Sequence, residues 1–121
     1  MTTIKLGAVA AFAVLLPTLV MAQDSTTQFQ LAPDAKNMAS CNVLDQSMGR
    51  AHTVTVKGGQ AVIKMAGGAD DELKVVRPGV YQTELALSGV RVAVVADLSG
   101  AAKTLTATEK SRGCKWMATK S

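Results

Sequence analysis

From Arg50 to the end of the chain, short runs of alternating apolar and polar residues are separated by glycine-rich turns. This period of two is typical of strands that bury one face. The pattern predicts about seven short strands, over residues 52–57, 61–65, 72–76, 80–87, 90–96, 103–110 and 113–118. Strands joined by such short turns form an antiparallel meander, whose apolar face must be covered by barrel closure or by a second sheet. We therefore expect a mainly β fold, either a small barrel or a sandwich.

Two turns contain residues that match a specific turn type. Gly58-Gly59 suits the type I′ turn of a two-residue hairpin, because glycine accepts positive φ at both positions. Pro78 followed by Gly79 fits a type II turn. The run over 90–96 is apolar on both faces, which predicts a central strand. The inward positions predicted for the later strands are Tyr81, Leu85, Leu87, Val90, Val92, Val94, Leu105, Ala107, Cys114 and Trp116.

The first 22 residues have the three parts of a secretory signal peptide. Lys5 provides the positive charge, residues 6–16 form an apolar run, and Val20-Met21-Ala22 offers small residues for cleavage. The run is about half the roughly 20 residues that a membrane-spanning helix needs, and Pro17 ends it. We therefore expect cleavage before Gln23, no membrane span in the mature chain, and a periplasmic or secreted protein. The residue directly after the expected cleavage site is Gln23 and not a cysteine, so a lipoprotein is not predicted.

The remaining chain is long enough for one domain. Residues 23–32 are polar and are expected to form a flexible arm, followed by a single β domain over residues 33–121. Between residues 33 and 48 the pattern fits a short helix with Gly49 at its C-cap. The apolar face of this helix would carry Ala35, Met38, Ala39 and Val43. A short strand around residues 41–44 is the alternative.

The mature chain retains two cysteines, Cys41 and Cys114. An even number in an exported chain predicts a disulfide. Closing a loop of this length contributes about 4 kcal/mol by the chain-entropy estimate. The wide spacing does not match the C-x-x-C pattern of redox or metal-binding pairs.

Charge points to two candidate contact regions. Without Lys5, 12 of the 13 basic residues remain against 9 acidic ones, and the excess lies near the C-terminus. Such a cluster can contact an anionic envelope component, although lysines on exposed strand edges also prevent aggregation. The other region is an acidic loop at residues 67–72. The predicted contact surface comprises Asp70, Asp71, Glu72, Lys110, Arg112 and Lys115.

Catalytic and cofactor chemistry find little support. His52 is the only histidine, it lacks a G-x-S-x-G partner motif, and we expect it to be solvated at a strand edge. The adjacent acids at 70–72 lack the alternate spacing of calcium loops. Met48 lies four residues from His52, but there is no clustered methionine motif for copper, and Met38 and Met65 are assigned to the core. We therefore expect no cofactor and no enzymatic activity.

Three aromatic residues remain in the mature chain, Phe29, Tyr81 and Trp116, and the last two are expected to be buried. Stacking on nucleic-acid bases needs exposed aromatics, so no nucleic-acid partner is predicted.

In size, export signal and single disulfide, the chain is similar to small periplasmic β-barrel inhibitors of lysozyme or proteases. This similarity concerns architecture only, and the expectation of a binding role comes from the missing catalytic residues and the small, disulfide-linked β domain. We therefore expect a non-enzymatic protein, inhibitor-like or structural, that binds a protein or an envelope component. The alternative is a carrier that holds a small apolar ligand in a barrel cavity. The partner and the oligomeric state stay open.

Overall fold

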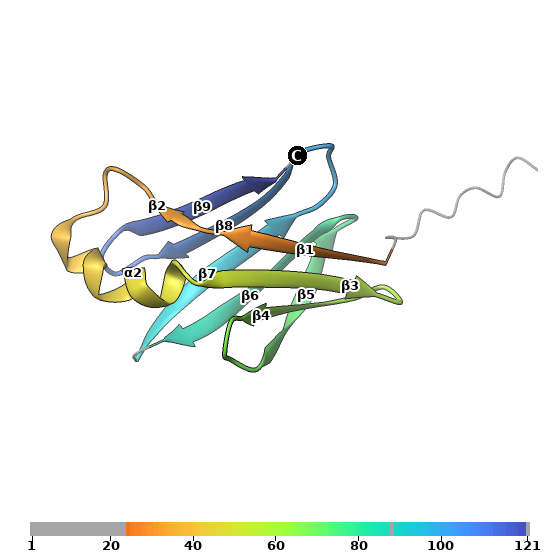
Figure 1. Cartoon of the computed structure of the whole chain (residues 1–121), viewed down its shortest axis with the longest axis horizontal. Helices are drawn as coiled ribbons and strands as arrows, with labels where there is room; N and C mark the ends of the chain where they lie inside the picture. The colour runs from red at the N-terminus through yellow and green to blue at the C-terminus, as the bar shows by residue number, and fades with distance from the viewer. Residues whose placement is uncertain (1–23, 88, 121) are drawn as a thin grey trace, which may run out of the picture.

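The computed structural model describes residues 24–87 and 89–120, so the predicted signal peptide lies outside the described residues. Nine antiparallel strands form one nearly closed sheet in the order β1-β3-β4-β5-β6-β7-β8-β9-β2 (Figure 1). The mainly β prediction is confirmed, with two strands more than the seven expected. The elements are β1 (Ser25–Gln30), β2 (Ala32–Pro33), the 3-10 turn η2 (Ala39–Cys41), α2 (Asn42–Met48), β3 (Ala51–Lys57), β4 (Gln60–Met65), β5 (Asp70–Arg77), β6 (Val80–Leu87), β7 (Val90–Asp97), β8 (Lys103–Glu109) and β9 (Cys114–Lys120).

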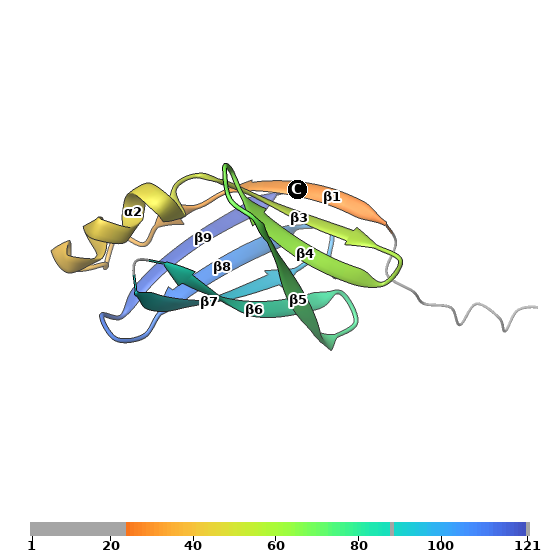
Figure 2. The same ribbon diagram turned by 90° about the horizontal axis from the view of Figure 1, so that it is seen from below.

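Two corner segments bend the sheet into a barrel. The chain bends at Leu31, so that β1 pairs with β3 while β2 pairs with β9. In β5, residues 70–73 pair with β4, whereas residues 74–77 pair with β6. Figure 2 shows the resulting layers, with β1, β3 and β4 over the sheet of β6–β9 and β5 crossing between them. The fold therefore combines the two expected architectures, since one barrel-like sheet is flattened into two layers.

The turns follow the predicted chemistry. Gly58 and Gly59 both have positive φ, at 60° and 83°, as the type I′ turn between β3 and β4 requires. Gly79 follows Pro78 with φ 80°, as a type II turn requires. These residues join their strands with short connections and thereby set the register of each hairpin.

Side chains fill the barrel interior. Trp116 is fully buried, and its indole Nε1 donates a hydrogen bond to the Asp45 carboxylate of α2 at 2.9 Å. This bond holds α2 over one end of the barrel, where the helix contributes Leu44 and Met48 to the core (Figure 1). Most of the predicted inward positions are buried, which confirms the prediction for Tyr81, Leu85, Val92, Val94, Leu105, Ala107, Cys114 and Trp116. The other two, Leu87 and Val90, are partly buried and pack against the core.

The N-terminal segment differs from the flexible arm expected over residues 23–32. Residues 25–30 form β1, and Phe29 and Leu31 are only 1% and 4% exposed. Thr27, Phe29 and Leu31 alternate inward, a strand pattern that the surrounding polar residues conceal in the sequence. The segment is therefore part of the barrel wall.

The predicted helix forms, but with a different buried face. The α-helix spans Asn42–Met48 and ends at Gly49, whose N–H donates to the Asp45 carbonyl. Met38 and Val43, assigned to the buried face, are 60% and 64% exposed. The helix starts later than expected, and the buried Cys41 fixes its rotation so that other residues face the core.

The Cys41–Cys114 disulfide is confirmed. The two Cα atoms lie 5.8 Å apart, within the usual range for a disulfide, and both residues are fully buried. The bond joins the turn before α2 to the first residue of β9 and so fixes the helix to the barrel. No helix among the described residues is long and apolar enough to span a membrane.

Candidate binding site

The predicted contact residues lie on two separate hairpins. Asp70, Asp71 and Glu72 are exposed, but they form the first residues of β5, opposite β4, and not a loop tip. Lys110 and Arg112 lie in the β8–β9 turn, and Lys115 follows on β9. Figures 1 and 2 both show the β4–β5 and β8–β9 turns apart, so the structure does not bring the acidic and basic groups together.

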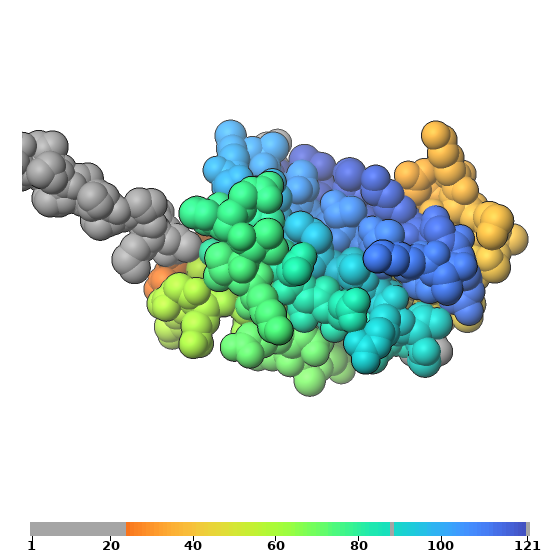
Figure 3. Space-filling view, turned by 180° about the vertical axis from the view of Figure 1, so that it is seen from behind, coloured from red at the N-terminus to blue at the C-terminus, as the bar shows by residue number. Residues whose placement is uncertain are grey.

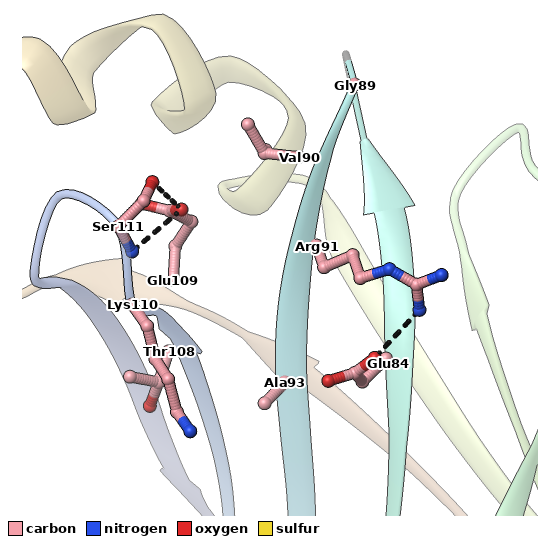
Figure 4. A pocket seen from close by; sticks show the side chains of 9 residues that line it. All are labelled: Glu84, Gly89, Val90, Arg91, Ala93, Thr108, Glu109, Lys110 and Ser111. Carbon is pink, nitrogen blue, oxygen red and sulfur yellow. Dashed lines mark hydrogen bonds and ion pairs between the residues drawn. The ribbon is translucent and has the colours of Figure 1, made fainter.

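The β8–β9 turn is braced by Glu109, a buried carboxylate that the sequence analysis did not single out. Its oxygens accept hydrogen bonds from the Ser111 hydroxyl and N–H (Figure 4). They also accept one from the Arg112 N–H. The bond from the Ser111 hydroxyl is the main cause that lowers the pKa of Glu109, because it favours the charged form. The carboxylate is thus occupied by its own turn.

A hollow of about 370 Å³ lies between the diverging ends of β7 and β8, next to this turn. On its other side, Arg91 and Glu84 form an ion pair at 2.9 Å, with side chains 77% and 55% exposed (Figure 4). Exposed pairs of this kind are worth little, on the order of 0–1 kcal/mol. The carboxylates and the guanidinium here, Glu84, Glu109 and Arg91, already have partners, so this hollow makes a weak candidate site.

A stronger candidate is the opening between β5 and β6, which we call the seam. The two strands pair from Arg77–Val80 to Lys74–Gln82. Beyond that point, residues 70–73 pair only with β4 and residues 83–87 pair only with β7, within the described ranges. Figure 2 shows β5 leaning away from β6 here, and Figure 3 shows the face that carries the two strands. The seam therefore exposes one edge of each strand.

The direction of the free backbone groups follows from the β6–β7 ladder. Leu87 and Val90 face each other across a two-residue turn, so they form a hydrogen-bonded pair. Because hydrogen-bonded pairs alternate along an antiparallel ladder, Glu84 and Ala86 direct their N–H and C=O groups away from β7. These groups point into the seam.

At the base of the seam is a half-enclosed pocket of about 260 Å³. Its walls come from β3, β4, β5 and β6 and are mostly apolar, with one acidic residue and the only histidine. The principal lining residues are His52, Ile63, Met65, Asp71, Leu85 and Leu87.

His52 was expected to be solvated, and that prediction is wrong. The side chain is fully buried, and its Nδ1 lies 2.7 Å from the Arg50 carbonyl oxygen. A carbonyl only accepts hydrogen bonds, so Nδ1 carries the proton and Nε2 is a bare acceptor. Burial lowers the pKa of His52, which keeps the ring neutral at neutral pH. The Nε2 atom has no hydrogen-bond partner among the residues that the structure describes.

A sequence signal for this burial existed. His52 has the same parity as Val54 and Val56 in one strand, so it faces the core whenever they do. Met65 lies directly opposite His52 on β4 and lines the pocket. Met48, the last residue of α2, belongs to the hydrophobic core. The described part of the chain contains no group of three His, Cys, Asp or Glu residues that could hold a metal ion.

Comparisons with family models, with curated proteins and with solved structures find nothing that matches this chain. Function is therefore argued from the seam and its pocket alone.

Proposed function

We propose that this chain is a non-enzymatic, exported binding protein that holds an extended segment of a partner protein in the seam between β5 and β6. The observation that carries the proposal is the unpaired edge of β6 over residues 83–87. Unpaired backbone groups are a template for an added strand, a common mode of peptide recognition.

The charges beside the seam favour a basic segment. Asp70, Asp71 and Glu72 are exposed on β5, and only Asp70 has a lysine, Lys64, directly opposite it on β4. On β6, Glu84 is engaged by Arg91. Residues 70–72 thus give the start of β5 excess negative charge beside the seam, whereas Lys74 and Arg77 lie further along, where β5 pairs with β6. This negative charge complements lysine or arginine in a bound strand.

Rigidity supports an inhibitor-like role. The disulfide and the bond between Trp116 and Asp45 fix α2 to β9, and α2 is followed directly by β3, which carries His52 of the seam pocket. A site that is held in place before binding loses less conformational entropy when a partner docks.

The edge itself can be tested without any ligand, by amide hydrogen exchange in the mature protein. We expect the amides of Glu84 and Ala86 to exchange fast and those of Leu85 and Leu87 to be protected, because only the amides of Leu85 and Leu87 donate hydrogen bonds to β7. Equal protection across the four amides would contradict the free edge.

Binding can be tested by selecting peptides from a displayed random library on the mature protein. We expect selected peptides to be extended, to be enriched in lysine or arginine, and to protect the Ala86 amide on binding. Ala86→Pro removes the donor that faces the seam and leaves the β7 ladder intact, as proline on an edge allows. It should weaken peptide binding tenfold or more, whereas the control Lys115→Gln, on the distant hairpin, should not.

Failure to select any peptide, or unchanged binding to a folded Ala86→Pro variant, would overturn the proposal. Because Ala86→Pro could perturb the strand, Asp71→Asn and Glu72→Gln provide a second measurement. They should weaken basic peptides and lower the salt dependence of their binding.

A second candidate is a carrier of a small apolar ligand, and the pocket lined by Ile63, Met65 and Leu85 favours it. The core fills the middle of the barrel, so such a ligand would be held at this end only. Native mass spectrometry of protein purified from its own envelope fraction would detect a retained small molecule.

A further inference from the structure

One buried ring nitrogen, Nε2 of His52, is left without a hydrogen-bond partner by the described part of the chain. The Arg50 carbonyl fixes the ring of His52 through Nδ1, so Nε2 is the ring nitrogen left free, and His52 is among the residues that line the pocket. Nε2 has no partner among the described residues and less than 1 Å² of exposed surface, so a group in the pocket reaches it only when the side chains that cover the ring move aside. A buried acceptor without a donor is unfavourable, which makes a donor in the pocket the expected complement.

The pocket has room for more than a water molecule. Its volume of about 260 Å³ lies just below the range of about 300–1,000 Å³ for small-molecule pockets. This size suits a single side chain better than a complete cofactor. The apolar residues Ile63, Leu85 and Leu87 would contact the body of such a group.

Two features of the pocket restrict which chemical group can occupy it. Met65 lies directly opposite His52, and methionine sulfur makes favourable contacts with aromatic rings. Asp71 also lines the pocket, and its negative charge disfavours a carboxylate there. Because the neutral imidazole cannot donate from Nε2, the bound group must supply the donor. The other charged neighbour, Arg50, points its Nη1 toward the Ala66 carbonyl at 3.4 Å.

We propose that this pocket is a subsite for an aromatic group that carries a hydrogen-bond donor, a phenol or an indole, and that His52 Nε2 accepts the bond. The identity of the source rests on the proposed function: the group is a tyrosine or tryptophan side chain of the bound segment. His52 is then a specificity-determining residue, which selects tyrosine over phenylalanine.

The test uses p-cresol, the tyrosine side-chain analogue, and 4-methylanisole, in which methylation removes the donor. Both are titrated into the mature protein near pH 7.5 with detection by NMR, including the nitrogen shifts of His52. We expect p-cresol to bind at least tenfold more tightly and to shift Nε2, while Nδ1 stays protonated. Binding of both compounds with equal affinity, or of neither, would overturn the proposal and leave water as the occupant.

Substitution of His52 and titration with pH distinguish a role of His52 in ligand binding from a purely structural role. The His52→Phe variant should bind 4-methylanisole and p-cresol with equal affinity. If this variant does not fold, His52→Gln is measured in its place. In the wild type, the preference for p-cresol should disappear as the pH falls and the imidazole takes up a proton at Nε2. A preference that persists in the folded variants would also overturn the proposal.

Peptides distinguish failure of the subsite from failure of the proposed function. If selected peptides bind through Ala86 but tyrosine and phenylalanine versions bind equally, the subsite is wrong and the proposed function survives. If p-cresol is selected over 4-methylanisole but no peptide binds, the subsite stands and the partner-segment function is wrong.

Discussion

Removal of the disulfide is the change whose effect on the free energy of unfolding follows most directly from the structure. The double variant Cys41→Ala/Cys114→Ala opens a loop whose ends are 73 residues apart in the sequence. The chain-entropy relation gives a loss of about 4.4 kcal/mol for a loop of this length. Domains of this size are stable by only about 5–15 kcal/mol, so the bond provides a large fraction of the total.

The structure also defines what remains after this change. The hydrogen bond from Trp116 to Asp45 still ties α2 to β9, so the helix need not detach from the barrel. For a domain of about 100 residues, each kcal/mol corresponds to roughly 4–8 °C in melting temperature. The variant should therefore melt roughly 18–35 °C lower than the wild type.

The assay is urea unfolding followed by the fluorescence of Trp116, the only tryptophan and a fully buried one. The m-value should rise, because the unfolded chain without the cross-link exposes more surface. Val43→Ala, at an exposed position of α2, is the control and should change stability by less than about 0.5 kcal/mol. A loss below about 1 kcal/mol with an unchanged m-value in the double variant would refute the entropic argument.

Three further predictions use the same measurement. Gly79→Ala should destabilise more than Gly89→Ala: both glycines have φ 80°, but only at position 79 does the new Cβ come within 2.8 Å of the Ser99 side chain. Equal losses would contradict the packing argument. Asp45→Ala leaves the indole N–H unpaired and should cost about 1–3 kcal/mol, with a red shift in emission. Since burial lowers the pKa of His52, the unfolded chain binds the extra proton first. Stability should therefore fall as pH drops below about 6.5, by up to about 1.4 kcal/mol per pH unit, until the folded pKa is reached. His52→Gln should remove this slope.

The strands from β3 onwards could be predicted because each has its own local pattern. Leu105 and Ala107 alternate with threonines, the run over 90–96 is apolar on both faces as in a central strand, and glycine turns set the boundaries. The disulfide could be predicted from the cysteine count together with the predicted export signal. Local sequence therefore defined most of the wall of the barrel.

The first strand could not be predicted in the same way. Phe29 lies among serine, threonine and glutamine residues, and β1 becomes a strand through pairing with β3. That partner begins more than 20 residues later, so the stabilising contacts are not visible in a local window. His52 was missed for a different reason: its chemistry was weighed alone, although its parity with Val54 placed it inside.

The seam was beyond prediction because it depends on a change of partner within one strand. Of the eight residues of β5, only Leu73 is buried, and it lies where the strand passes from β4 to β6. An amphipathic strand would bury every second residue. The sequence contains the acidic residues and valines of β5, but the point at which it leaves one layer is set by the closure of the whole sheet.

Comparison of the two corners supports treating the seam as a binding site. At the first corner, β2 pairs with β9, and the Lys120 ammonium donates to the Gln28 carbonyl of β1 at 3.1 Å, which bridges the gap. At the second corner, the hydrogen bonds found for the described residues include none between residues 70–73 of β5 and residues 83–87 of β6. Closing a small barrel requires both corners, yet only one is bridged by its own chain. The open corner is also the one that combines free backbone groups, excess negative charge and the bare acceptor of His52, so a partner strand would satisfy there what the fold itself leaves unpaired.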